Sequence, residues 1–183
     1  MSSEEVARRS NNGATRKLAF LLCFAALLLL HVGANLWWLE QDHHSIQSDE
    51  SLHMRYARDY FEILVLDESQ GLGDRVLEAF QKQNSSPPVS HLLAVGLMAW
   101  RGYGPDEIAL TGTILFVLLL LGVYAAARQC MPPWEALFAT LVTSFVPLLF
   151  GASRNFMTDY ASAVFVVWAM YCLIKSNVFQ NTG

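Results

Sequence analysis

Residues 109–128 read ALTGTILFVLLLLGVYAAAR, a run that carries no charged side chain before Arg128. About 20 apolar residues in a helix cross the roughly 30 Å hydrocarbon core of a bilayer, so this stretch predicts a membrane span. Residues 18–39 (LAFLLCFAALLLLHVGANLWWL) and 157–175 (MTDYASAVFVVWAMYCLIK) meet the same test, and the slightly shorter residues 134–151 (WEALFATLVTSFVPLLFG) are counted with them. The sequence therefore predicts an all-α fold, a polytopic transmembrane helix bundle of four spans.

The composition is that of a chain that lies in a lipid bilayer. Apolar residues make up 54% of the 183 residues and charged residues only 15%, whereas a soluble domain carries about 25% charged residues. The charges crowd into a few segments, which excludes a nucleic-acid-binding protein with a broad basic face and a disordered tail protein. We therefore expect the bilayer, and no nucleic acid, as a partner.

Basic residues near the ends of the spans indicate which side faces the cytoplasm, because Lys and Arg favour the cytoplasmic ends. Four of them precede the first span, Arg128 follows the second, and Lys175 ends the fourth (the first four are Arg8, Arg9, Arg16 and Lys17). All agree with a multi-pass protein of the plasma (inner) membrane whose basic tail, residues 1–17, is cytoplasmic. The alternative for the first run is a secretory signal, since Val32-Gly33-Ala34 loosely resembles a cleavage site.

In this topology residues 40–107 form one large extracytoplasmic loop with twelve acidic and five basic residues. Apolar residues at intervals of three and four after Ser48 predict an amphipathic helix with Ser48 as its N-cap. A second short helix is predicted over residues 72–83. Residues 89–100 follow Pro87-Pro88 and are too short to cross the membrane, so we expect an interfacial helix there.

Charged residues at the outer membrane face are candidates for function. Asp49 and Glu50 fall in the first turn of the predicted loop helix, where they either complement the helix dipole or perform chemistry. Arg154 and Asp159 lie at the outer end of the fourth span, where a charge is costly unless it has a partner. These two residues could simply pair with each other across the helix.

A divalent metal ion is a possible cofactor of the same loop. Acidic and histidine side chains cluster within a dozen residues there (Asp42, His43, His44, Asp49, Glu50 and His53). Glu50 and His53 are three residues apart and would share a helix face, as pairs of metal ligands do. We take Asp49 and His53 as the candidate ligands. The alternative is a set of solvated loop histidines.

Four stretches in a fixed order carry a resemblance to a known family. They are Ser48-Asp49-Glu50, Ser86-Pro87-Pro88-Val89, Ala125-Ala126-Ala127-Arg128, and Ser153-Arg154 through Asp159. From residue 18 to residue 176 the chain resembles the N-terminal part of the polytopic membrane glycosyltransferases of the C superfamily. The protein O-mannosyltransferase and aminoarabinose transferase branch is the most similar.

The resemblance implies transfer of a sugar from a polyprenyl-phosphate carrier to an extracytoplasmic lipid, glycan or protein acceptor, with inversion at the anomeric carbon. It implies that Asp49 is the general base, that Glu50 lies beside it, and that Asp159 positions the acceptor or a metal. Arg154 would pair with the lipid phosphate. Members of the family often carry His or Lys before the Pro-Pro pair, where this chain has Ser86, so His91 is the candidate for the missing phosphate contact.

Members of the family that this chain resembles are several times longer than this chain and have many more spans. We therefore expect residues 177–183 to mark a truncation point, with further C-terminal spans of the same polypeptide as partners. The alternative function is a non-catalytic membrane scaffold or assembly subunit that binds a partner through its acidic loop.

Overall fold

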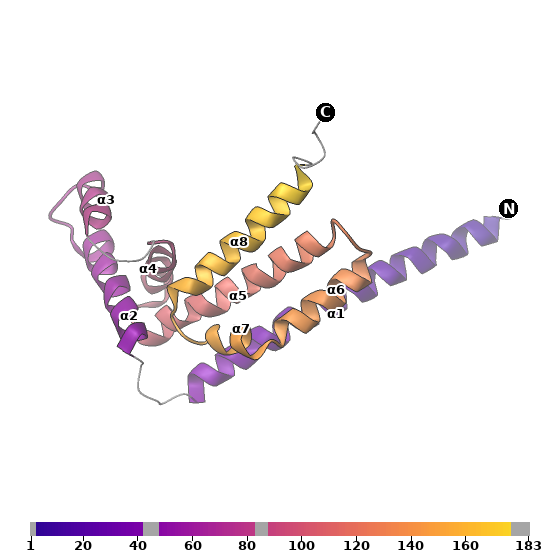
Figure 1. Ribbon diagram of the computed structural model, residues 1–183, viewed down its shortest axis with the longest axis horizontal. Helices are drawn as coiled ribbons and strands as arrows, with labels where there is room; N and C mark the ends of the chain where they lie inside the picture. The colour runs from indigo at the N-terminus through magenta and orange to yellow at the C-terminus, as the bar shows by residue number, and fades with distance from the viewer. Residues whose placement is uncertain (1–2, 42–47, 83–87, 177–183) are drawn as a thin grey trace.

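The computed structural model describes residues 3–41, 48–82 and 88–176, and within these ranges every regular element is a helix (Figure 1). The elements are α1 (Ser3–Gln41), α2 (Ser48–Phe61), the π-helix η1 (Glu62–Leu66), α3 (Leu72–Gln81), α4 (Val89–Arg101), α5 (Pro105–Ala127), α6 (Pro133–Ser144), α7 (Pro147–Ala152) and α8 (Thr158–Lys175). The all-α fold class predicted from the sequence is confirmed for the described residues.

Two helices of the described chain are long and apolar enough to cross a membrane, residues Thr15–Gln41 of α1 and the whole of α5. They correspond to the first and second predicted spans. α8 covers the fourth predicted span but is not among the helices that are apolar enough to count as candidate spans, so this span stays a prediction. Two of the four predicted spans thus have a helix long and apolar enough to cross a membrane.

Residues 134–151, predicted as one span, form two helices. α6 ends at Ser144, and Val146 is extended with φ −62° and ψ 118° before Pro147 begins α7. Proline lacks a backbone N–H and disfavours helical geometry in the residue before it, so it breaks one helix and starts the next. The third span therefore also stays a prediction, and its apolar stretch does not form a single straight helix.

α5 is the central helix of the bundle and lies between α8 on one side and α1 and α6 on the other (Figure 1). Gly122 lets α8 approach closely, because a Cβ atom there would lie 3.0 Å from the Val167 Cγ1 and Trp168 Nε1 atoms. The Trp168 indole N–H donates a hydrogen bond to the Leu118 carbonyl at 3.0 Å. Close packing and interhelical hydrogen bonds hold apolar helices together in lipid.

The loop helices α2, η1, α3 and α4 form a separate layer at one end of the bundle, beside the starts of α5 and α8 (Figure 1). Their core joins Ala57, Tyr60 and Phe61 of α2 to Ala94 and Met98 of α4. The helix predicted over residues 89–100 is confirmed as α4, but it buries one face between α2 and α5. The position of α4 along the membrane surface stays a prediction.

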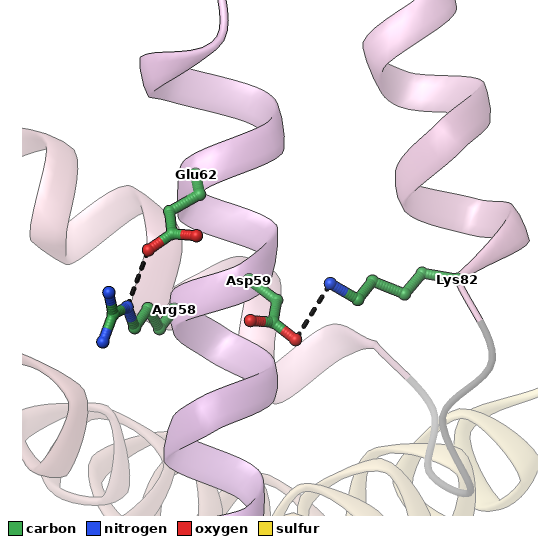
Figure 2. Close-up of polar contacts among 4 residues, drawn as sticks. All are labelled: Arg58, Asp59, Glu62 and Lys82. Carbon is green, nitrogen blue, oxygen red and sulfur yellow. Dashed lines mark hydrogen bonds and ion pairs between the residues drawn. The ribbon is translucent and has the colours of Figure 1, made fainter.

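Two ion pairs and one backbone contact occur in the part of this layer formed by α2, η1 and α3. Lys82 Nζ lies 2.9 Å from Asp59 Oδ2, which joins the end of α3 to α2, and Arg58 pairs with Glu62 at 2.7 Å (Figure 2). Arg75 of α3 donates to the Leu64 carbonyl of η1 at 3.1 Å. The exposed pairs contribute little stability in water, so the packing of apolar side chains contributes most of the stability of this layer.

Candidate functional site

The start of α2 packs against the segment that connects α7 to α8. The Glu50 Oε1 atom accepts a hydrogen bond from the Phe156 backbone N–H at 2.9 Å, and both residues are buried. A carboxylate that accepts from a backbone N–H forms a charge-assisted hydrogen bond, which is stronger than a neutral one. Glu50 thereby fixes the acidic end of α2 to a residue that lies three positions before Asp159.

His53, one turn further along α2, makes a second contact with the start of α8. Its Nε2 atom lies 3.4 Å from Thr158 Oγ1 and 3.9 Å from Asp49 Oδ1. His53 is buried, whereas the Asp49 side chain is 64% exposed. The two α2 contacts leave Asp49 open at the edge of the α2–α8 junction.

Asp159 lies in the first turn of α8 and is exposed. It has no hydrogen bond or ion pair with any described residue, so the alternative in which Arg154 and Asp159 pair is wrong. The structure brings Glu50 and His53 against Phe156 and Thr158, and Asp159 follows directly. The acidic end of α2 and the head of α8, predicted to lie on one side, are thus neighbours.

Arg154 is held by side chains of α1 and α7 instead. Its Nε atom donates to Asn35 Oδ1 at 3.2 Å, and its guanidinium carbon lies 4.4 Å from the Trp38 ring centre and 4.2 Å from that of Phe150. Burial lowers the pKa of Arg154 below its ordinary value, but an arginine keeps its charge in proteins. The terminal NH₂ groups make no hydrogen bond within the described ranges, so this cation can bind an anion.

Asn35, which sequence reasoning missed, connects three parts of the chain at this end of the bundle. It is fully buried, and its Nδ2 atom donates to Thr113 Oγ1 of α5 at 3.2 Å and to Ser153 Oγ at 2.9 Å, while its Oδ1 atom accepts from Arg154. All of its strong polar groups are therefore satisfied. Its only signal in the sequence is an amide within the otherwise apolar first span.

Gly112 of α5 allows the Ser153–Asn155 segment to lie directly on the helix backbone. A Cβ atom at Gly112 would lie 2.5 Å from the Ser153 carbonyl oxygen and 3.0 Å from that of Asn155. Both neighbours are backbone atoms, which cannot rotate away as a side chain can. The close contact at Gly112 therefore fixes the distance between α5 and the segment that carries Arg154.

His91, the candidate for a second phosphate contact, is fully buried in α4. Its ring centre lies 5.5 Å from that of His53, 5.8 Å from Tyr60 and 5.6 Å from Phe156. The described contacts do not bring His91 to Arg154. The ring packs against those of His53 and Phe156, and its contact with a phosphate stays a prediction.

A divalent cation finds an incomplete set of ligands here. Asp49 and His53 lie close together, but the His53 Nε2 atom is shared with Thr158. No group of three or more His, Cys, Asp or Glu side chains that could hold a metal occurs in residues 3–41, 48–82 and 88–176. Asp42, His43 and His44 lie outside the described residues. Among the described residues Asp49 and His53 remain the two candidate ligands, and the metal site stays a prediction.

The contact between Glu50 and Phe156 can be tested by a stability measurement. Glu50→Gln keeps the size of the side chain and an acceptor oxygen but replaces a charge-assisted hydrogen bond by a neutral one, so we expect the free energy of unfolding to fall by about 1 kcal/mol. Glu62→Gln is the matched control, because Glu62 pairs with Arg58 at the surface and such pairs contribute little. Thermal unfolding in detergent should separate the two variants, and equal midpoints would contradict the role of Glu50.

The fold and the site define a class of protein, a helical membrane protein with an arginine and several carboxylates gathered at one end of its bundle. Residues 85–182 match the family of dolichyl-phosphate-mannose-protein mannosyltransferases, and the chain belongs to this family. It is thus a glycosyltransferase-like membrane protein. The match includes α4 to α8 with Arg154 and Asp159 and begins after α2, which carries Asp49 and Glu50. No curated protein and no solved structure gives a significant match.

Proposed function

We propose that the chain is the N-terminal part of a glycosyltransferase that moves a sugar from a polyprenyl-phosphate donor to an extracytoplasmic lipid, glycan or protein acceptor. The observation that carries the proposal is the junction of α2 with the Ser153–Asp159 segment, where a partly buried arginine and exposed carboxylates lie on neighbouring elements. A lipid-linked donor keeps its phosphate at headgroup level. Its enzyme therefore needs a cation and a base at the end of a membrane bundle.

Arg154 is the proposed partner of the donor phosphate. Trp38 and Phe150 lie against its guanidinium group and Asn35 holds its Nε atom, so the group is held in place before a ligand arrives. Arginine binds phosphate oxygens through paired N–H donors. As the sugar–phosphate bond breaks, negative charge develops on the departing phosphate, and Arg154 stabilises that charge.

Asp49 is the proposed general base, since it is the exposed carboxylate at the junction on the α2 side. It accepts the proton of the acceptor hydroxyl while the hydroxyl oxygen bonds to the anomeric carbon. The bond from that carbon to the phosphate oxygen breaks on the opposite face, its electron pair leaves with the polyprenyl phosphate, and the configuration inverts. Glu50 positions Asp49 by its hydrogen bond to Phe156, and Asp159 orients the acceptor.

The orientation in the membrane is part of the proposal, and cysteine labelling tests it. Gln70, between η1 and α3, and Cys130, in the turn after α5, are both exposed. We expect Gln70→Cys to react from outside with a membrane-impermeant maleimide, and Cys130 to react only after the membrane is opened. Each reporter is measured alone in a background without Cys23 and Cys172, and labelling of both from the same side would contradict the topology.

A transfer assay separates an enzyme from the alternative scaffold. The protein, with any further spans of its polypeptide, is incubated with polyprenyl-phosphate-linked sugars, and release of free polyprenyl phosphate is measured. An enzyme releases it in a manner that depends on Asp49. A scaffold releases none with any donor, although it keeps its folded helix content.

A further inference from the structure

At the end of the bundle opposite the α2–α8 junction, the turn between α5 and α6 lies beside α1 (Figure 1). A cavity lies between these elements. Its volume is about 440 Å³. Three basic side chains line it, Arg16 and Lys17 of α1 and Arg128 after α5, together with the aromatic rings of Phe20, Tyr124 and Trp134. None of the donor or acceptor residues proposed above belongs to it.

The aromatic rings form one packed wall of this cavity. The Phe20 ring centre lies 5.5 Å from that of Trp134 in an edge-to-face arrangement and 5.7 Å from that of Tyr124, and Tyr124 also contacts Phe24 at 4.9 Å. Rings that pack in this way join α1, α5 and α6 into a fixed surface. Trp and Tyr favour the depth of lipid headgroups, where one side is apolar and the other is wet. The wall is thus suited to the upper part of an acyl chain.

The charges at the rim of the cavity are of one sign. No acidic side chain lines it, and neither Arg16 nor Lys17 forms an ion pair with a residue that the structure describes. Arg128 donates to the Met131 carbonyl, which ties its guanidinium to the turn. A rim of three cations above an aromatic wall complements an amphiphile with an anionic head and apolar chains.

We propose that this cavity binds the phosphate headgroup of an anionic membrane phospholipid, with Arg16, Lys17 and Arg128 at the phosphate and the aromatic wall against the chain. The bound lipid joins α1 to the α5–α6 turn from the membrane side. The proposal stands on this cavity alone and is independent of the proposed sugar transfer.

Native mass spectrometry of the purified chain in neutral detergent tests the proposal. The probes are phosphatidylglycerol, zwitterionic phosphatidylcholine of the same chain length, and water-soluble glycerol 1-phosphate. One Lys or Arg near an anionic lipid surface contributes an affinity factor of about five. We therefore expect phosphatidylglycerol to bind best, Lys17→Gln to weaken it about fivefold, and the Arg16→Gln/Lys17→Gln double variant to weaken it further.

Lys175→Gln is the matched control, because Lys175 ends α8, outside the cavity, where its Nζ atom lies 5.5 Å from the Tyr171 ring centre. It removes the same charge and should leave lipid binding unchanged. Arg16 and Lys17 are exposed, so their replacement does not disturb the core. Equal loss in Lys17→Gln and Lys175→Gln would overturn the proposal, as would equal binding of the two lipids. Binding of glycerol 1-phosphate as tight as that of phosphatidylglycerol would overturn the lipid assignment.

Discussion

Asp49→Asn lowers the rate of sugar transfer by a factor of roughly 10²–10⁴, the range that a positioned general base contributes. Asn has nearly the same shape as Asp but cannot take a proton from the acceptor hydroxyl. Asp49 is 64% exposed and bears no buried hydrogen bond, so the fold should persist. Initial rates of polyprenyl-phosphate release, with donor binding measured separately, give the loss in turnover.

Asp74→Asn is the matched control for this prediction. Asp74 is an exposed aspartate in the first turn of α3, as Asp49 is in the first turn of α2. Each change removes one favourable interaction with a helix dipole, and only Asp49 borders the α2–α8 junction. If the two variants turned over sugar at similar rates, Asp49 would have no catalytic role.

Gly112→Ala should lower the free energy of unfolding by about 1–3 kcal/mol, the usual cost of forcing an extra carbon into a packed region. The added Cβ atom would lie 2.5 Å from the Ser153 carbonyl oxygen, so the connection between α7 and α8 must move away from α5. Because this connection carries Arg154, we expect donor affinity to fall together with the thermal unfolding midpoint.

Gly33→Ala provides the comparison within the membrane helices. A Cβ atom at Gly33 would meet no atom within 4 Å, and alanine favours a helix over glycine by up to about 1 kcal/mol. This variant should unfold at an unchanged or higher temperature. An unchanged midpoint in Gly112→Ala would show that the connection can shift at no cost, and Gly112 would then not position Arg154.

The local helices of this protein could be predicted from the sequence because their signals are local. The helix that starts at Ser48, the short helix from Leu72 and the helix after Pro88 all occur as expected. The break between α6 and α7 was harder to predict, because the stretch through Pro147 contains enough apolar residues to be counted as one membrane span. Such a count measures hydrophobicity, whereas the break depends on the backbone geometry that proline imposes.

The site could be predicted only in part, because its contacts join residues far apart in the sequence. Asp49 and Glu50 are adjacent carboxylates that the sequence does not distinguish, yet the structure buries Glu50 against Phe156 and leaves Asp49 exposed. Asn35 reaches Thr113 and Ser153, 78 and 118 residues away. No periodicity reports such a contact. A polar residue within an apolar span is the one feature that could have indicated it.

The satisfied amide of Asn35 has a consequence for the first helix. A helix that served only as an anchor could be exchanged for any other apolar helix of equal length, but α1 presents two different sides. Leu22 and Leu29 are exposed, so other apolar residues can replace them. His31, Asn35 and Trp38 contact the rings of α5 and α7 or Arg154, so these three positions tolerate few replacements. If another apolar helix replaced α1 up to Leu39, the chain would still insert into the membrane, but it would lack the α1 side chains that hold Arg154.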